Sequence, residues 1–229
     1  MNKLSIIIPA YNEKDTVLEI INKIKAVDLG KVMKELIIVD DFSKDGTREI
    51  LQNIHDKEIK THYHKKNMGK GMAIRTGLKH VTGNIVIIQD ADLEYNPEDY
   101  KQLIKPILEN KYDVVYGSRV LDKKELKYAY YTFYLGGRLV TFFTNLLYFS
   151  NLTDEPTCYK TFKTNVIKNI DIKGERFEWE PEVTAKILKK GIKIHEVPIS
   201  YYPRDRKHGK KINWKDGIQA IWTLVKYRF

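Results

Sequence analysis

The chain has 229 residues, of which 42% are hydrophobic and 31% are charged, and its formal net charge is +10. This composition is typical of a globular protein with one large or two small domains, and it excludes collagen-like, coiled-coil and low-complexity classes. The lone cysteine, Cys158, excludes an internal disulfide framework and a cysteine-rich zinc site, while the positive charge favours phosphate-rich partners such as nucleotides, nucleic acid or an anionic lipid surface.

The first 120 residues alternate short β-branched apolar runs with segments of helical periodicity. Asn96 followed by Pro97 is typical of a helix start, with a capping side chain and a proline at the first helical position. Continuous apolar strands that alternate with helices favour an α/β fold, in which a mostly parallel sheet is covered on both faces. We predict strands at 4–9, 36–39, 58–62, 85–89 and 114–117, and helices at 13–27, 47–54, 70–80 and 97–108.

The second half of the chain has a less regular pattern. We predict a strand at 157–162, a helix at 182–190, an edge strand at 192–202 that contains Pro198, and a closing helix at 213–227. Residues 203–229 hold eight Lys or Arg and two Asp, so the positive charge is concentrated there. We expect a single domain over residues 1–229, because no linker or internal repeat divides it.

The most hydrophobic stretch, residues 128–153, has Arg138 as its only charge. Gly136, Gly137 and Asn145 interrupt it, so we do not expect a membrane-spanning helix there; the apolar run at 4–9 is likewise too short for a signal peptide. Its apolar side chains recur with spacings of 4, 3, 4 and 3, which predicts an amphipathic helix. The stripe consists of Leu135, Leu139, Phe142, Leu146 and Phe149. Such a helix either packs its stripe on the core or lies on a membrane surface.

Polar clusters follow three of the predicted strands, at 9–13, 40–47 and 89–94. Ligands of parallel α/β sheets bind beyond the carboxyl ends of the strands, so these clusters mark the expected site. Asp90 and Asp92 are the sharpest pair, because two carboxylates directly after a strand can hold a hard cation and leave positions for phosphate oxygens. An isolated Asp-x-Asp is more often a solvated turn, so the pair gains its weight from the neighbouring clusters.

Two common phosphate-binding loops are absent from the sequence. No G-x-G-x-x-G follows the first strand and no G-x-x-x-x-G-K-[ST] occurs, which removes the main support for a dinucleotide-binding or P-loop protein. A glycine-rich turn at 67–71 leads into a helix and could bring backbone amides or Lys70 near a phosphate. A plain turn before a helix explains the same residues equally well.

The order and spacing of these clusters over residues 1–120 resemble glycosyltransferase family 2, which has the GT-A fold. The motifs are Ile8 to Glu13, Val39 to Thr47, Asn67 to Gly71, Asp90-Ala91-Asp92 and Gly117-Ser118-Arg119. Within that family the chain is most similar to polyprenyl-phosphate sugar transferases such as dolichol-phosphate mannose synthase, through residues 90–94 and 202–211. The resemblance implies a Rossmann-like GT-A sheet with a nucleotide-sugar-binding half at 1–120 and an acceptor-binding half at 121–229.

The resemblance also implies roles for individual residues around the donor. The base and ribose pocket would be lined by Pro9, Tyr11, Glu13 and Asp41. Asp90 and Asp92 would hold Mg²⁺ or Mn²⁺ on the donor diphosphate, with Glu94 as a third ligand where the lipid-phosphate enzymes usually carry Gln. The cations expected to face the phosphates or close over the reaction centre are Lys70, Arg119, Arg204, Arg206 and Lys210. A dication and arginines aimed at the departing nucleoside diphosphate lower the barrier to transfer.

The acceptor decides whether a catalytic base is needed. A hydroxyl acceptor must lose a proton, whereas a phosphate monoester is already ionised at pH 7 because its second pKa is about 6. In the family pattern Asp154 occupies the base-like position and Glu182 matches a second acidic position. Either residue could instead orient the basic side chains, cap a turn or sit in the first turn of a helix.

The resemblance therefore implies an inverting, metal-dependent transfer of a hexose from a GDP- or UDP-sugar to a dolichyl or undecaprenyl phosphate. The main alternative is transfer to a sugar hydroxyl during polysaccharide or glycan assembly. A nucleotidyltransferase and a nucleic-acid-binding module are weaker hypotheses. Nucleic-acid binding would explain the basic tail but not the acidic residues at the strand ends, so we expect no nucleic-acid partner. We expect a cytoplasmic protein with peripheral contact at the cytoplasmic face of the membrane.

Overall fold

The computed structural model describes residues 2–122, 131–204 and 214–229. Its centre is a seven-stranded sheet with the strand order β3-β2-β1-β4-β6-β5-β7. The strands are β1 (Lys3–Ala10), β2 (Met33–Asp40), β3 (Ile59–Tyr63), β4 (Ile85–Ile88), β5 (Val114–Ser118), β6 (Lys160–Lys163) and β7 (Ile194–Pro198). All neighbouring pairs are parallel except those of β6, which runs antiparallel to β4 and β5. The predicted mostly parallel sheet is confirmed, and Pro198 closes a strand at the sheet edge as expected.

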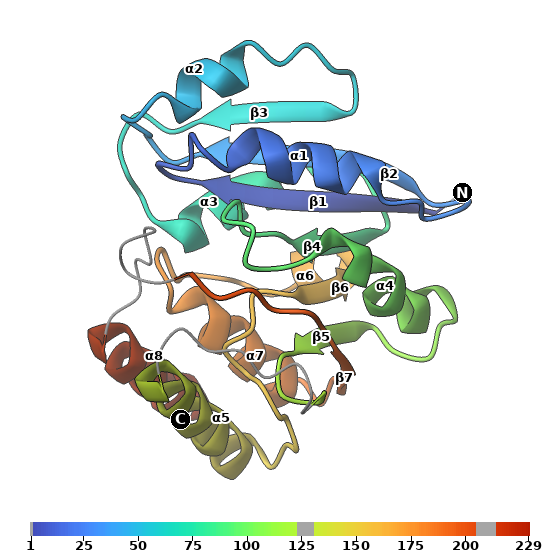
Figure 1. Cartoon of the computed structure of the whole chain (residues 1–229). Helices are drawn as coiled ribbons and strands as arrows, with labels where there is room; N and C mark the ends of the chain where they lie inside the picture. Colours follow the sequence, from blue (N-terminus) through green and yellow to red (C-terminus); the bar gives the residue numbers. More distant parts are fainter. Residues whose placement is uncertain (1, 123–130, 205–213) are drawn as a thin grey trace.

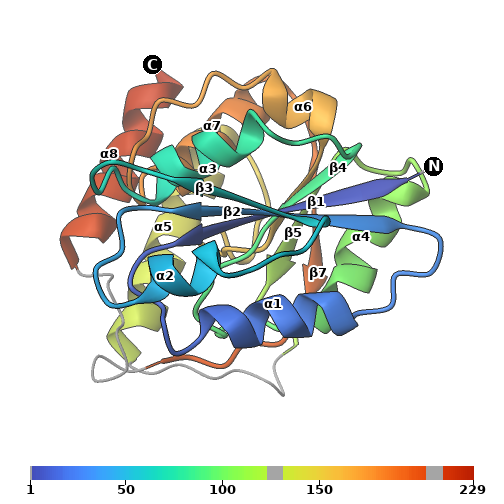
Figure 2. The ribbon, with the colours of Figure 1, turned by 90° about the horizontal axis from the view of Figure 1, so that it is seen from above.

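Helices cover both faces of the sheet (Figures 1 and 2). Seen from above, α1 and α4 lie on one face, while α3, α6 and α7 lie on the other (Figure 2). The helices of the first half are α1 (Val17–Ala26), α2 (Thr47–Gln52), α3 (Lys70–Leu78), η1 (Pro97–Asp99) and α4 (Tyr100–Leu108). Those of the second half are α5 (Tyr131–Tyr148), α6 (Thr164–Lys168), α7 (Trp179–Lys189) and α8 (Trp214–Arg228). This layered arrangement agrees with the Rossmann-like sheet that the sequence predicted, and α6 is the one helix among the described residues that the prediction omitted.

The core forms where the apolar strand runs meet the apolar faces of the helices. Strands β1 and β4 are buried on both faces, because they lie inside the sheet between two helical layers. Asn96 caps η1 by accepting a hydrogen bond from the Glu98 amide, and Pro97 follows it, as predicted. The predicted helix at 13–27 begins only at Val17; before it lies a turn in which the Thr16 and Val17 amides both donate to the Glu13 carbonyl.

The buried face of helix α5 is not the face that carries the predicted apolar stripe. Val140, Thr144 and Tyr148 are buried, whereas Phe142 is 58% exposed and Leu146 is 57% exposed. The interpretation that the stripe packs on the core is therefore wrong; the stripe faces outward and the face bearing the threonines packs inward. The inward face fits because Thr141 and Thr144 donate their hydroxyls to the carbonyls of Gly137 and Val140 within the helix.

Helices α5 and α8 lie side by side on the outside of α7, away from the sheet (Figure 1). The Tyr148 hydroxyl on α5 donates a 2.7 Å hydrogen bond to the Leu224 carbonyl on α8, and both residues share a small buried cluster with Ala185 of α7. Among the described helices, none combines the length and the apolar composition that crossing a membrane requires.

Candidate active site

A cavity of about 880 Å³ is lined by the residues that follow β1, β2 and β4. These strands end at the same edge of the sheet, because they run parallel (Figure 1). The floor of the cavity is formed by the residues that follow these strands, including Pro9, Asp41 and Asp90. Its far walls come from the second half of the chain: the loop after β5, the segment 153–158, the start of α7, and the N-terminal parts of α5 and α8. The three predicted strand-end clusters therefore meet at one place, together with segments that are distant in sequence.

Arg204 joins three of the predicted carboxylates. Its guanidinium lies 3.1 Å from Glu13 Oε2 and 2.9 Å from Asp92 Oδ2. Its amide donates to Glu94 Oε1 at 2.7 Å, and the Tyr201 hydroxyl donates to Glu94 Oε2 at 2.9 Å. Both oxygens of Glu94 thus hold the segment that carries Arg204, and the metal ligation predicted for Glu94 stays a prediction.

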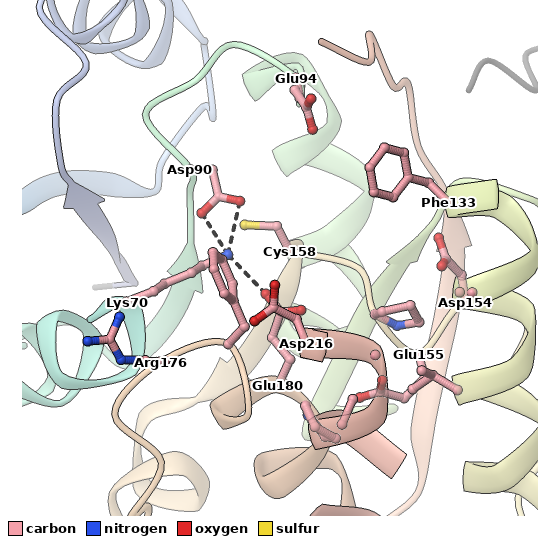
Figure 3. Close-up of a pocket in the computed structure, with 18 of the residues that line it drawn as sticks. Lys70, Asp90, Glu94, Phe133, Asp154, Glu155, Cys158, Arg176, Glu180 and Asp216 are labelled. Atoms are coloured by element: carbon pink, nitrogen blue, oxygen red, sulfur yellow. Dashed lines mark hydrogen bonds and ion pairs between the residues drawn. The ribbon is translucent and has the colours of Figure 1, made fainter. Parts of the chain in front are cut away.

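Lys70 makes the second cationic bridge, between the first and second halves of the chain (Figure 3). Its amine is 2.8 Å from Asp90 Oδ1 and 2.9 Å from Glu180 Oε1. Burial alone would lower the pKa of Lys70, but the carboxylates of Asp90 and Glu180 raise it well above its ordinary value. Lys70 therefore carries its charge at neutral pH and sits at the level of the carboxylates, consistent with the predicted position near a phosphate.

Within the described residues, the carboxylates around Lys70 and Arg204 outnumber these two cations. Lys70 and Arg204 face Asp90, Asp92 and three glutamates, namely Glu13, Glu94 and Glu180. Burial, together with the charges of Asp90 and Glu94, raises the pKa of Asp92 to about 7, which reflects this excess.

Three or more His, Cys, Asp or Glu side chains are nowhere gathered closely enough to hold a metal ion by themselves in the described part of the chain. Two hard carboxylate donors in a negatively charged pocket nevertheless fit a divalent cation that takes its remaining ligands from a bound diphosphate. The donor set of Asp90 and Asp92 thus agrees with the predicted site.

Asp41 fixes the start of α3 at the cavity. Its carboxylate accepts hydrogen bonds from the amides of Met68 at 2.8 Å and Gly69 at 2.7 Å, and it lies 2.7 Å from His64 Nδ1. Gly69 has a φ of 94°, which a glycine adopts without strain, and it leads directly into the helix that carries Lys70. Asp41 lines the cavity as predicted, and its bonds also position Lys70.

Asp154 and Arg119 form a bidentate ion pair in the cavity wall. Arg119 Nε is 2.7 Å from Asp154 Oδ2, Nη2 is 2.7 Å from Oδ1, and the Arg119 amide also donates to Oδ2 at 2.9 Å. Burial would raise the pKa of Asp154, but Arg119 holds it below its usual value. The carboxylate of Glu196 in β7 accepts hydrogen bonds from the amides of Thr153 and Asp154, which fixes this segment on the sheet. A carboxylate so occupied is suited to orienting Arg119.

Glu182 lies outside the cavity, and Glu180 lies inside it. The Glu182 carboxylate accepts hydrogen bonds from the amides of Lys173 at 2.8 Å and Gly174 at 2.5 Å, and it pairs with Lys186. The sequence analysis did not select Glu180. Residues two apart on a helix point ~200° apart, so the predicted residue and the one that reaches the site occupy opposite faces of α7.

The structure thus brings most of the predicted site residues together. Those that line the cavity are Pro9, Tyr11, Glu13, Asp41, Lys70, Asp90, Asp92, Glu94, Arg119, Asp154 and Arg204. Arg206 and Lys210 were also predicted, and both lie outside the described residues. Lining residues that the sequence analysis did not identify include Arg176, Glu180 and the aromatic side chains Phe133 and Trp214.

Comparison with known proteins agrees with this geometry. The model of the family "Glycosyl transferase family 2" matches residues 5–171. The chain belongs to glycosyl transferase family 2. It is therefore a nucleotide-sugar-dependent glycosyltransferase, as the strand-end motifs predicted.

Curated relatives cover nearly the whole chain at moderate identity. An uncharacterized protein of Methanocaldococcus jannaschii is 29% identical over 98% of this chain and 91% of its own length. The UDP-N-acetylglucosamine–dolichyl-phosphate N-acetylglucosaminyltransferase of Methanococcus voltae is 27% identical over 96% of this chain and 94% of its own length. The glycosyltransferase AglJ of Haloferax volcanii is 26% identical over 87% of this chain and 63% of its own length.

Solved structures share the fold at lower identity. Glucosyl-3-phosphoglycerate synthase of Mycobacterium tuberculosis, crystallised with Mn²⁺, UDP and glucosyl-3-phosphoglycerate, superposes with a TM-score of 0.74 at 18% identity, over 99% of this chain and 80% of that one. Mannosyl-3-phosphoglycerate synthase of Rubrobacter xylanophilus gives a TM-score of 0.74 at 19% identity, over 99% of this chain and 72% of that one. At such identities the likeness establishes the GT-A fold alone.

Proposed function

We propose that this glycosyltransferase moves a hexose from a nucleoside-diphosphate sugar to a polyprenyl phosphate, dolichyl or undecaprenyl, with inversion at the anomeric carbon. One observation carries the proposal: a single cavity joins three chemically different walls. Its lining includes carboxylates with Lys70, the guanidinium groups of Arg119 and Arg138, and apolar residues of α5 and α8 such as Leu139 and Ile218. A sugar nucleotide, a phosphate and a hydrocarbon chain would each meet a matching wall.

On the donor side, Pro9, Tyr11, Glu13 and Asp41 are proposed to line the base and ribose pocket. Asp90 and Asp92 would hold Mg²⁺ or Mn²⁺, which when bound neutralises charge on the diphosphate. Lys70 and Arg204 stay beside these carboxylates and contribute fixed positive charge where the leaving group becomes more negative. UDP-sugars are the first donors to test, because the Methanococcus voltae relative is named for a UDP-sugar and the Mycobacterium tuberculosis structure holds UDP; GDP-hexoses are the second.

On the acceptor side, the proposed nucleophile is an oxygen of the phosphate monoester. It attacks the anomeric carbon while the bond from that carbon to the diphosphate oxygen breaks, so the nucleoside diphosphate leaves from the opposite face. No proton has to be removed, because the acceptor is largely a dianion at neutral pH. This fits the state of Asp154, whose two oxygens are both held by Arg119, leaving it to position the guanidinium. Because a polyprenyl phosphate resides in a bilayer, the proposal includes peripheral contact with a membrane, on its cytoplasmic face.

A second candidate is transfer to a hydroxyl group. One observation favours it: Glu180 places a carboxylate in the cavity, where such a group takes up the proton of a hydroxyl nucleophile. Against this role, Glu180 is ion-paired with Lys70 at 2.9 Å, which engages one of its oxygens.

Product analysis separates the candidates. Purified protein with Mn²⁺ or Mg²⁺ is offered UDP- and GDP-sugars together with a polyprenyl phosphate, a sugar hydroxyl acceptor or 3-phosphoglycerate, and products are identified by mass spectrometry. We expect a glycosyl-phosphoryl lipid and release of the nucleoside diphosphate. Transfer only to hydroxyl acceptors would replace this proposal with the second candidate, and release of pyrophosphate would contradict both.

A further inference from the structure

Helices α5 and α8 expose large apolar side chains on their outer faces. On α5 and just after it these are Tyr131, Leu135, Leu139, Phe142, Leu146 and Phe149; on α8 and at its end they are Trp214, Ile218, Trp222 and Phe229. Phe142 and Trp222, near the middle of the two helices, are 58% and 60% exposed. At about 100° per residue, each set falls within an arc of ~80°. We call these two stripes together the α5–α8 surface. Contiguous exposed apolar patches on a folded domain mark interaction sites.

The two stripes belong to one rigid unit. The opposite face of α5 is buried through Val140 and Tyr148, and that of α8 through Leu224, in one cluster on α7. The hydrogen bond from the Tyr148 hydroxyl to the Leu224 carbonyl ties the two helices together. Each helix is therefore already packed without its outer stripe, and the stripes remain available to a partner.

The charges of α5 and α8 select the kind of partner. Cations on these helices are Arg138, Lys215, Lys226 and Arg228, and Asp216 is the one carboxylate in their sequences. Trp and Tyr next to Lys or Arg are typical of segments that lie in a lipid interface, and each cation near an anionic leaflet contributes about 1 kcal/mol of attraction. A second copy of the chain is a poorer match, because a two-fold contact would bring the same positive patches face to face.

The cavity reaches this surface at the N-terminal parts of the two helices. Leu139 on α5 and Ile218 on α8 both line the cavity and are exposed to solvent. Gly136 on α5 and Gly217 on α8 both line the cavity, and a Cβ built at either glycine would meet no atom of the described residues within 4 Å. Glycine inside a helix costs about 1 kcal/mol relative to alanine, and here neither glycine is required by packing. Each glycine therefore leaves open space at the cavity wall among the described residues.

We propose that the α5–α8 surface seats the enzyme on an anionic lipid bilayer, and that the gap beside Gly136 and Gly217 is the passage by which the acceptor's hydrocarbon chain leaves the cavity for the bilayer. The inference rests on the proposed function for the identity of that chain, but the seating on lipid does not. Bound in this orientation, the protein has the open end of the cavity against the membrane, and the carboxylate floor faces away from it.

Vesicle flotation tests the seating without donor, metal or turnover. Full-length protein is mixed with phosphatidylcholine vesicles that contain or lack phosphatidylglycerol. The triple variant Phe142→Gln, Leu146→Gln, Trp222→Gln is compared with Leu18→Gln, Met33→Gln, which changes exposed apolar residues on α1 and β2 (47% and 45% exposed). We expect the wild-type chain to float with the anionic vesicles and the control to bind as the wild type does. The triple variant should bind at least about tenfold more weakly.

Equal binding by the triple variant, an equal loss in the control, or no flotation of the wild type would overturn the inference. Light scattering of the same samples tests the alternative occupant, a second copy of the chain. If the wild type is a dimer and the triple variant is a monomer, the surface is a dimer interface. Thermal melting of each variant shows whether it is folded.

The variant Gly217→Leu tests the passage. We expect kcat/KM for a long polyprenyl phosphate in vesicles to fall about tenfold more than kcat/KM for a short, water-soluble prenyl phosphate, with Gly217→Ala in between. Equal losses for the two acceptors would overturn the passage. If no lipid phosphate accepts sugar at all, the proposed function fails, and the flotation result still decides the seating.

Discussion

The proposed donor and acceptor halves of the cavity are built in different ways. The donor half consists of strand ends, and its charged side chains are already tied to one another: Arg204 joins Glu13 to Asp92, and Lys70 joins Asp90 to the acceptor half. The acceptor half consists of helix faces and loops, with glycines beside open space and apolar side chains exposed to solvent.

This difference shows where each half would obtain its specificity. A prearranged set of charges suits a small, highly charged ligand whose phosphates enter at fixed positions. An open, apolar passage suits a long chain that needs burial without a unique conformation. The ion pairs of the donor half should therefore be sensitive to single charge changes, whereas the acceptor half should respond to changes in volume and polarity.

The largest effect is expected from Asp90→Asn or Asp92→Asn. Each removes a carboxylate proposed to hold the dication, and we expect sugar transfer to fall by about 10³-fold or more. Binding of Mn²⁺ with UDP, followed by calorimetry, should weaken in parallel. Glu98→Gln, an exposed carboxylate paired with Lys101 outside the cavity, is the control. Retention of metal-dependent transfer by both aspartate variants would show that the donor half works differently.

The variant Asp154→Asn tests whether Asp154 acts as a general base or positions the Arg119 guanidinium. A general base contributes about 10²–10⁴-fold, so its loss would nearly abolish transfer. If Asp154 positions Arg119, we expect a loss of about tenfold, mostly in the KM of the acceptor, and an unchanged shape of the pH–rate profile.

Stability provides the control for this variant. Leaving Arg119 buried without its full partner should lower the free energy of unfolding by about 3 kcal/mol, and the double variant Asp154→Asn, Arg119→Gln should recover part of that loss. A near-complete loss of transfer with a shifted acid limb would make Asp154 the base.

Glu180→Gln and Glu182→Gln compare two neighbouring carboxylates of α7. Loss of the Glu180 charge leaves Lys70 to pair with Asp90 alone, so we expect about tenfold slower transfer and weaker Mn²⁺ binding, with little change in stability. Loss of the Glu182 charge weakens its hold on the Lys173 and Gly174 amides, so we expect about 1–3 kcal/mol less stability. Slower transfer by Glu182→Gln at an unchanged melting temperature would restore the role that the sequence predicted for Glu182.

The donor half could be predicted from the sequence because each of its motifs directly follows a strand. Residues 9–13, 40–47 and 89–94 come together once the strands are parallel, and parallel strands follow from the alternation of apolar runs and helices. The same argument located Lys70, which begins the helix after a glycine turn.

The acceptor half could not be predicted in this way, because helix faces and distant segments form it. The α5 stripe identified a helix correctly, but spacing alone does not say which face meets the core, and internal threonine hydrogen bonds allow the other face to be buried. Glu180 differs from Glu182 only in which side of α7 it occupies. The approach of α5 to α8 depends on tertiary contacts such as that of Tyr148 with Leu224.

The smallest effect is expected at the opposite end of the sheet, where Glu35 is buried and does not line the cavity. Its carboxylate accepts hydrogen bonds from Ser5 Oγ at 2.6 Å and the Thr82 amide at 2.8 Å, and it pairs with Lys3 at 2.9 Å. Burial would raise the pKa of Glu35, but these partners lower it well below its ordinary value. The charge therefore stabilises the fold above the unfolded pKa of about 4.3, and this contribution is lost as the pH falls below that value.

We expect the free energy of unfolding of Glu35→Gln to be about 1–3 kcal/mol lower than that of the wild type at pH 7, and the two values to converge in acid. Transfer at pH 7 should stay unchanged. Denaturant titrations at several pH values test this, and a constant difference down to strong acid would show that shape, and not charge, makes Glu35 stabilising.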